Sequence, residues 1–329
     1  MKGFPVRSGK TAGVLLSLLA LGLALRLGNA ATGSLKLDDF HSLYHARAAD
    51  LAEFFRVLRL DNHPPLEFLL VRAARALFGE SPWALRLPSL LAGMGTLLVA
   101  WRLGARLPGR AARALLVWLL AVSTLHVELS TDVRMYALLA LASAGLLEGL
   151  VALLEDGRGT LRVALWTWVG LHAHYHFLYS LAWLGGTAAW LVLRQPAYRV
   201  RRRALCAAFA LAALLSLPWY ALGFPEQLRH GLPPGGANAE VLRLGEGFKN
   251  FLFLNVSVAG SGLRALGLAG SCLALLLALS GAYALLRRER AQGRLALVAL
   301  CLASAGGVPL LAWLAARKRQ FERIRHPFL

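Results

Sequence analysis

Long apolar runs alternate along the whole chain with short polar connections. Each run approaches the roughly 20 residues that a helix needs to cross a bilayer, and a helix satisfies its own backbone polar groups there. The pattern predicts an all-α, polytopic integral membrane protein with about nine transmembrane helices. The predicted crossings start near Thr11, Trp83, Ala111, Met135, Leu161, Leu178, Ala204, Gly262 and Leu295.

The apolar run from Pro65 to Gly79 does not fit a crossing. A helix of roughly 15 residues rises only about 22 Å. Glu67, Arg72 and Arg75 also interrupt its apolar stripe. We therefore expect this segment to lie in the membrane interface.

Charge sets the orientation of the predicted spans. The chain is 57% hydrophobic and 16% charged with a formal net charge of +19, but its basic residues form short clusters between apolar runs. Nucleic-acid binding needs a contiguous basic face instead, so no nucleic-acid partner is expected. With the N-terminus inside and the first helix kept as a signal anchor rather than cleaved, these clusters fall on the cytoplasmic side. They are Arg102/Arg106/Arg110/Arg113, Arg158/Arg162, Arg199/Arg201/Arg202/Arg203 and Arg287/Arg288/Arg290/Arg294.

Four loops then face outward: 30–81, 126–134, 172–177 and 223–261. In the first, helical spacing predicts an amphipathic helix from Phe40 to Leu60, and Pro64 and Pro65 end it and open the next helix. The last is a second large loop that sequence alone does not identify as a lid. No internal repeat or linker is visible, so residues 1–329 are expected to form one transmembrane domain.

The outer loops hold several short polar motifs. They are Leu37-Asp38-Asp39, Asp61-Asn62-His63-Pro64-Pro65-Leu66, Ser130-Thr131-Asp132-Val133-Arg134-Met135-Tyr136 and His172-Ala173-His174-Tyr175, with Trp83-Ala84-Leu85-Arg86-Leu87-Pro88-Ser89 at the start of the second crossing. Together, over about Thr11 to Tyr220, they resemble the GT-C superfamily of membrane glycosyltransferases. The likeness is to the branch that holds the lipid A aminoarabinose transferase, the protein O-mannosyltransferases (glycosyltransferase family 39) and the RgtA/B/C/D-like enzymes.

The resemblance implies a hexosyl- or pentosyltransferase that uses a polyprenyl-phosphate sugar and inverts the sugar linkage. Its acceptor would be a hydroxyl of a cell-envelope molecule: lipid A or lipopolysaccharide, a glycan or a protein. The enzyme would lie in the bacterial inner membrane among its lipids, with the active site facing the periplasm. Asp38 takes the place of the family's proposed base and Asp39 replaces the usual Glu beside it, so both are candidate catalytic residues, of which one would be the base and the other would anchor the loop or help to hold a metal. Asp132 stands where relatives often have Glu. Relatives usually continue with further spans and often with an outer domain, and whether this chain is a C-terminally shortened form is not determined by the sequence.

The chemistry requires a base for the acceptor proton and a cation for the departing phosphate. A phosphodiester leaves already charged, so a second carboxyl acid is not needed. Arg134 is the candidate phosphate partner because its planar fork can bind two phosphate oxygens. Asp61, His63, Asp132, Tyr136 and His174 are the candidate cavity and substrate residues.

Structural roles compete with each assignment. Asp38 and Asp39 also suit a helix N-cap, Asp61 and His63 suit a turn, and Asp132 and Arg134 suit a loop pair. Asp132 and Tyr136 share a face only if the helix has begun by Asp132. A divalent metal stays open as a cofactor, with Asp38, Asp132 and His63 as candidate ligands, whereas a metal pair of His172 and His176 is disfavoured.

Two other functions stay open. A transporter or lipid flippase would keep its charged residues near the bilayer midplane, whereas the acids here gather at one face. A non-catalytic remnant is the alternative that a shortened C-terminus suggests. The sugar, the acceptor and the oligomeric state are not determined by the sequence.

Overall fold

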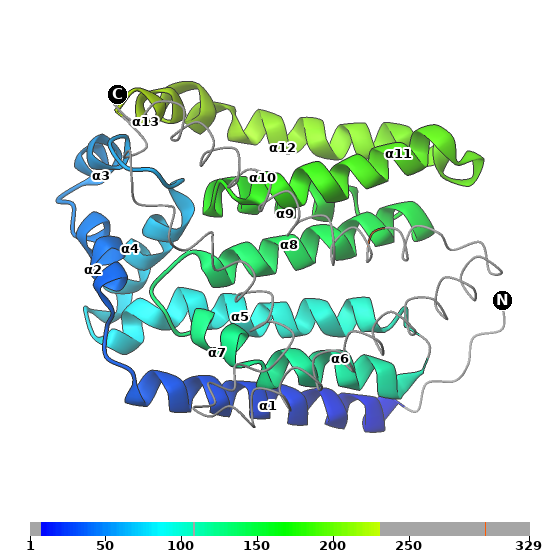
Figure 1. The fold of residues 1–329 in the computed structure, drawn as a ribbon, viewed down its shortest axis with the longest axis horizontal. Coiled ribbons are helices and arrows are strands. Elements are labelled where there is room, and N and C mark those ends of the chain that lie inside the picture. The colour runs from blue at the N-terminus through cyan, green and yellow to red at the C-terminus, as the bar shows by residue number, and fades with distance from the viewer. Residues whose placement is uncertain (1–7, 108, 231–299, 301–329) are drawn as a thin grey trace, which may run out of the picture. The chain divides into compact units, whose positions relative to one another are not determined.

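All regular elements in the described part of the chain are helices, as predicted. The computed structural model describes residues 8–107, 109–230 and 300. The elements of Figure 1 are α1 (Ser8–Thr32), α2 (Leu37–Ala46), α3 (Leu51–Leu58), α4 (Leu66–Phe78), α5 (Pro82–Gly104), α6 (Arg110–Val122), α7 (Thr124–Leu129), α8 (Tyr136–Val151), η1 (Ala152–Asp156), α9 (Thr160–Ala173), α10 (Phe177–Ser180), η2 (Leu181–Gly185), α11 (Gly186–Arg194), η3 (Pro196–Arg201), α12 (Arg202–Leu222) and α13 (Phe224–His230).

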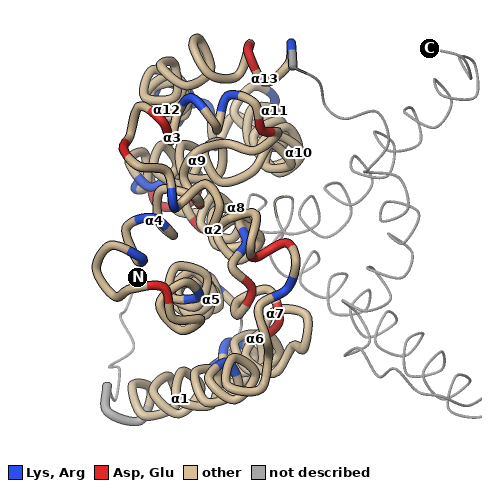
Figure 2. The backbone as a smooth tube through the Cα atoms, turned by 90° about the vertical axis from the view of Figure 1, so that its left-hand side faces the viewer, with Lys and Arg blue, Asp and Glu red and all other residues tan. Residues whose placement is uncertain are grey.

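Four helical stretches among the described residues are long and apolar enough to cross a membrane. They are Thr11–Thr32, Pro82–Gly104, Tyr136–Asp156 and Pro196–Leu222. Figure 2 shows the long helices mostly in the colour of uncharged residues, with charges concentrated in turns and short helices. These features support a multi-pass membrane protein.

The other predicted crossings stay predictions. Helices α6 and α9 occupy two of them but have only 13 and 14 residues. A third, from Leu178, is divided into α10, the π-helical segment η2 and α11. The crossings predicted from Gly262 and Leu295, and most of the loop 223–261, lie outside the described residues.

The chain divides into two compact units. The first comprises residues 1–54 and 65–144, and the second comprises 55–64 and 145–329, so helix α8 begins in one and ends in the other. In the first unit, α1, α5 and α6 run side by side (Figure 1) around a core of Leu97, Ala100, Trp101, Val117 and Ala121. In the second unit, α9 packs along α12.

A smaller apolar cluster in the first unit lies beneath the predicted outer loops. It joins Leu43 and Ala46 of α2, Val71 of α4 and Leu85 of α5 to Val133 in the turn before α8. Burying these side chains together stabilises the unit by about 1.5–3 kcal/mol for each large residue. The cluster therefore holds two loops that are distant in sequence at the same end of the helices.

The single helix predicted from Phe40 to Leu60 is wrong. The structure divides it into α2, which ends at Ala46, and α3, which begins at Leu51. The Asp50 carboxylate accepts a hydrogen bond from the Glu53 amide at 2.8 Å, as an N-cap residue does. The next helix, α4, begins at Leu66 directly after the proline pair, and Gly79 follows its end at a φ of 81°.

Helix α1 contains a fully buried cation, Arg26. Its guanidinium donates to the Gly22 carbonyl at 2.8 Å, to the Ala121 carbonyl at 3.4 Å and to the His126 ring at 2.5 Å. Burial, with the Arg26 charge second, lowers the pKa of His126 to about 4. His126 is therefore neutral at pH 7 and accepts the Arg26 hydrogen bond, which fixes α1 to α7.

Lowering the pH should destabilise this contact. An unfolded His126 binds a proton near its ordinary pKa of about 6.5, whereas the folded one does so only near pH 4. Stability should therefore fall between these values by up to about 3 kcal/mol. Thermal unfolding of the purified protein should show a lower Tm at pH 5 than at pH 7. His126→Gln should flatten this dependence, and an unchanged slope in that variant would contradict the assignment.

Candidate active site

Arg86 fixes the chain that leads out of α1. It lies in the second turn of α5 and is 5% exposed. Its guanidinium donates to the carbonyl groups of Ala30, Gly33 and Ser34 at 2.7, 2.8 and 3.0 Å. These three bonds hold the segment between α1 and α2 against α5, and the position of the first acidic motif depends on them.

Asp39 joins the first outer loop to the second. Its carboxylate accepts hydrogen bonds from two backbone amides, Lys36 at 2.8 Å and Val133 at 2.8 Å, and the residue is 2% exposed. The first bond caps α2, and the second crosses 94 positions of sequence. Asp39 therefore serves as a brace between the motif at 37–39 and the motif at 130–136.

Asp38 has the opposite environment. It lies in the first turn of α2 and is exposed, and its carboxylate has no hydrogen bond or ion pair within the described residues. Its backbone carbonyl accepts a hydrogen bond from the Arg134 guanidinium at 3.5 Å. The Asp38 carboxylate is thus open to solvent on a backbone that contacts Arg134.

Lys36 forms ion pairs with two carboxylates of the second outer loop. Its ammonium lies 2.8 Å from the Glu128 carboxylate and 2.9 Å from that of Asp132. Burial raises the pKa of Asp132, and the Lys36 charge partly offsets this effect. Asp132 lies in the bend before α8, so it shares no helical face with Tyr136, the first residue of that helix.

Arg134 is buried, at 7% exposed, with few partners. In the described residues its guanidinium makes only the 3.5 Å bond to Asp38, and its Nε has no partner. Its central carbon lies 5.9 Å from the centre of the Tyr136 ring, and the Ser89 hydroxyl donates to its backbone carbonyl at 3.2 Å. The backbone is fixed while most of the guanidinium donors stay unused.

Asp61, His63 and His174 lie in the second unit. The His63 ring donates to the Asp61 carboxylate at 3.0 Å, and it meets the His174 ring edge to face at 5.5 Å. The His174 ring nitrogen in turn accepts a hydrogen bond from the His176 amide at 2.9 Å. These residues form a hydrogen-bonded group at the end of α9.

Gln227 of α13 holds that group in place. Its side-chain amide donates to the carbonyl groups of Leu58 and His63 at 2.7 and 2.9 Å, and its oxygen accepts a hydrogen bond from Tyr175. The Trp219 indole donates to the Tyr175 hydroxyl at 3.2 Å. Tyr175 and Trp219 thus have structural partners. No motif or spacing in the sequence indicated Gln227, which lies in the predicted outer loop 223–261.

Metal binding by Asp38, Asp132 and His63 stays a prediction. In the described part of the chain, these three residues belong to no group of three or more ligating side chains. The Lys36 ammonium already supplies a cation to Asp132. His172 donates from its Nδ1 to the Trp168 carbonyl at 2.9 Å.

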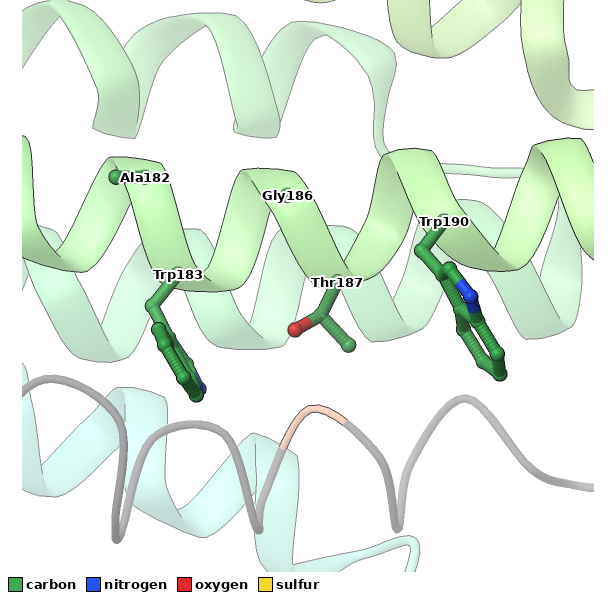
Figure 3. Close-up of a pocket in the computed structure, with 5 residues that line it drawn as sticks. All are labelled: Ala182, Trp183, Gly186, Thr187 and Trp190. Carbon is green, nitrogen blue, oxygen red and sulfur yellow. The ribbon is translucent and has the colours of Figure 1, made fainter.

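An apolar pocket on η2 and α11 is not a candidate for the reaction. Figure 3 shows Trp183, Thr187 and Trp190 projecting from one side of this helix, with Ala182 and Gly186 completing the lining. None of the five carries a carboxyl, imidazole or basic group. The pocket offers surface for apolar chains but no base.

Comparison with known families gives one match. Residues 62–221 match the model of the dolichyl-phosphate-mannose-protein mannosyltransferase family. The matched segment contains His63, Asp132, Arg134, Tyr136 and His174, and it begins after Asp38 and Asp39. No curated protein and no solved structure matches the chain. The family match supports the GT-C resemblance, and with it a membrane glycosyltransferase of the GT-C kind.

The two neighbouring aspartates should respond differently to truncation. Asp39→Ala leaves two backbone amides without their acceptor and should lower the free energy of unfolding by about 2–3 kcal/mol. Asp38→Ala removes an exposed carboxylate and should change it by less than about 0.5 kcal/mol. Thermal unfolding of both purified variants tests this contrast. Equal Tm values for the two would contradict the bracing role of Asp39.

Proposed function

We propose that this chain transfers a monosaccharide from a polyprenyl-phosphate donor to a hydroxyl of a cell-envelope acceptor. The reaction takes place at the periplasmic face of the bacterial inner membrane. Asp38 is the general base and Arg134 binds the donor phosphate. The observation that carries the proposal is Arg134 itself, a buried guanidinium with most of its donors unused, beside the backbone of an exposed aspartate.

The Arg134 side chain suits a phosphodiester. A buried cation with unused donors is costly unless an anion pairs with it, and a guanidinium can bind two phosphate oxygens together. As the sugar–oxygen bond breaks, negative charge accumulates on the phosphate, and a fixed cation stabilises that charge. Arg134 thereby lowers the barrier without donating a proton.

The acceptor hydroxyl must lose its proton as it attacks the sugar. Asp38 is the available carboxylate because Asp39 is occupied by two backbone amides and Asp132 by Lys36. A single base with direct displacement inverts the sugar linkage. We assign Asp39 the role of anchoring the loop and Asp132 that of lining the site.

Tyr136, in the first unit, is proposed as a cavity residue beside Arg134, and Asp61, His63 and His174, in the second unit, are proposed as substrate-binding residues in their own right. The Tyr136 ring lies beneath the Arg134 guanidinium. The imidazole–carboxylate pair of His63 and Asp61 and the neighbouring His174 offer hydrogen bonds suited to sugar hydroxyls. No step requires a metal ion.

Replacing the base tests the function. Purified Asp38→Asn protein, given a membrane lipid extract as donor source, should release polyprenyl phosphate about a hundredfold more slowly than the unaltered chain, because its base is lost. Mass spectrometry of the lipids measures this release and the mass of the sugar transferred.

The matched control is Asp50→Asn in the same loop, where Asn retains the N-cap acceptor of α3. It should transfer at the unaltered rate. An Asp38→Asn protein as active as this control would exclude Asp38 as the base. An unaltered chain that transfers nothing from any extract would contradict the glycosyltransferase activity itself.

A further inference from the structure

Glu67 is a buried carboxyl that the proposed reaction does not use. It is the second residue of α4 and is 1% exposed. Neither of its carboxylate oxygens has a hydrogen-bond partner within the described residues. Burial raises the pKa of Glu67 to about 7, and the Arg134 charge opposes that effect.

Glu67 and Arg134 belong to segments that pack together, but they are not a hydrogen-bonded pair. Val71, one turn after Glu67 in α4, and Val133, next to Arg134, are buried in the same apolar cluster. The Arg134 charge acts on Glu67, yet no hydrogen bond joins them and the Arg134 Nε has no partner. A stable buried ion pair needs close contact and further hydrogen bonds on both groups. The two groups therefore lie in segments held by one apolar cluster, and both have unused hydrogen-bonding capacity.

We propose that Glu67 is a proton-linked positioning residue, which takes up one proton when a phosphodiester binds to Arg134. This inference rests on the proposed function, because it assumes that Arg134 binds the donor phosphate. Before binding, an ionised Glu67 partly balances the guanidinium. After binding, Glu67 is protonated and neutral, so the charge of the Arg134 guanidinium interacts with the phosphate alone.

The coupling follows from electrostatics. A bound phosphodiester places a second negative charge near the one guanidinium that favours the ionised form of Glu67. A nearby like charge disfavours ionisation of a carboxyl, so the pKa of Glu67 rises on binding. Binding must therefore strengthen as the pH falls through the range in which free Glu67 titrates.

The neighbouring elements carry other charged and titratable groups, most of which contact residues other than Glu67. On α2, Asp39 accepts two amides, and the rings of His41 and His45 contact Phe68. The Asp38 carboxylate of α2 is exposed. On α5, Arg86 donates to three carbonyl groups. The Arg72 guanidinium of α4 donates to the Ala46 and Ala48 carbonyls. Two further charged residues form ion pairs: Arg75 with Glu80, and Asp132 with Lys36.

Calorimetry of the purified full chain tests the proposal. The probe is farnesyl methyl phosphate, a phosphodiester with no ionisation of its own near neutral pH. Titrations at pH 7.5 in buffers of different ionisation enthalpy should show uptake of about half a proton. If binding raises the pKa of Glu67 by one unit, affinity should fall about fivefold between pH 6 and pH 8.

Single-residue variants identify the group that takes up the proton. Glu67→Gln should bind the probe with no uptake and with a flat pH dependence. Glu80→Gln alters an exposed glutamate that Arg47 and Arg75 already hold ionised, so the uptake should persist. His45→Gln removes a ring that contacts Phe68 beside Glu67, and the uptake should persist there too.

The outcomes separate the two proposals. A wild-type chain that does not bind the probe at any pH would overturn the proposed phosphate site, and the inference with it. Binding without proton uptake would overturn only the role of Glu67. Proton uptake that persists in Glu67→Gln, or that disappears in His45→Gln, would also overturn the role of Glu67. The titration of the wild-type chain can overturn the role of Glu67 even if Glu67→Gln does not fold, because it shows whether any proton is taken up.

Discussion

The arrangement of the first unit depends on the two hydrogen bonds that the Asp39 carboxylate accepts. One caps α2 at Lys36, and the other ties that helix to Val133 in the turn before α8. Because the carboxylate is buried, both bonds are difficult for water to replace. They set the distance between the backbone of Asp38 and the side chain of Arg134, and hence the geometry of any reaction that uses both.

Three buried arginines in the first unit show how the same side chain serves different purposes. Arg26 and Arg86 each satisfy their terminal nitrogens with three partners, mostly backbone carbonyls, and so fix helices and loops. Arg134 has one long contact, although its burial is similar. A guanidinium whose two terminal nitrogens both donate to the protein is a structural clamp, whereas one that makes a single long bond through them is suited to bind an anion. This contrast distinguishes Arg134 more clearly than burial alone does.

The helical fold and the assignment of the polar motifs to outer loops follow from the sequence, because apolar run length and the distribution of arginines report directly on the bilayer. Side-chain roles are less accessible. The pairing of Asp39 with Val133 needs two loops brought together by packing, and no local spacing encodes it. Glu67 stood out as a charge in an apolar stripe, but its burial without a partner could not be read from the sequence. Arg86 was part of a motif, but the carbonyl groups that it contacts are distant in sequence. The break at Asp50 was missed because apolar spacing continues on both sides of it.

The central claim is that a lipid-borne phosphate binds at Arg134, on the side of the first unit where Asp38 is exposed. The most direct test is an experimental structure of the chain in lipid with a polyprenyl phosphodiester bound. The account predicts phosphate oxygens within about 3 Å of the Arg134 guanidinium nitrogens. A phosphate bound instead at the arginine clusters of the opposite helix ends, with Arg134 still buried and unoccupied, would contradict it.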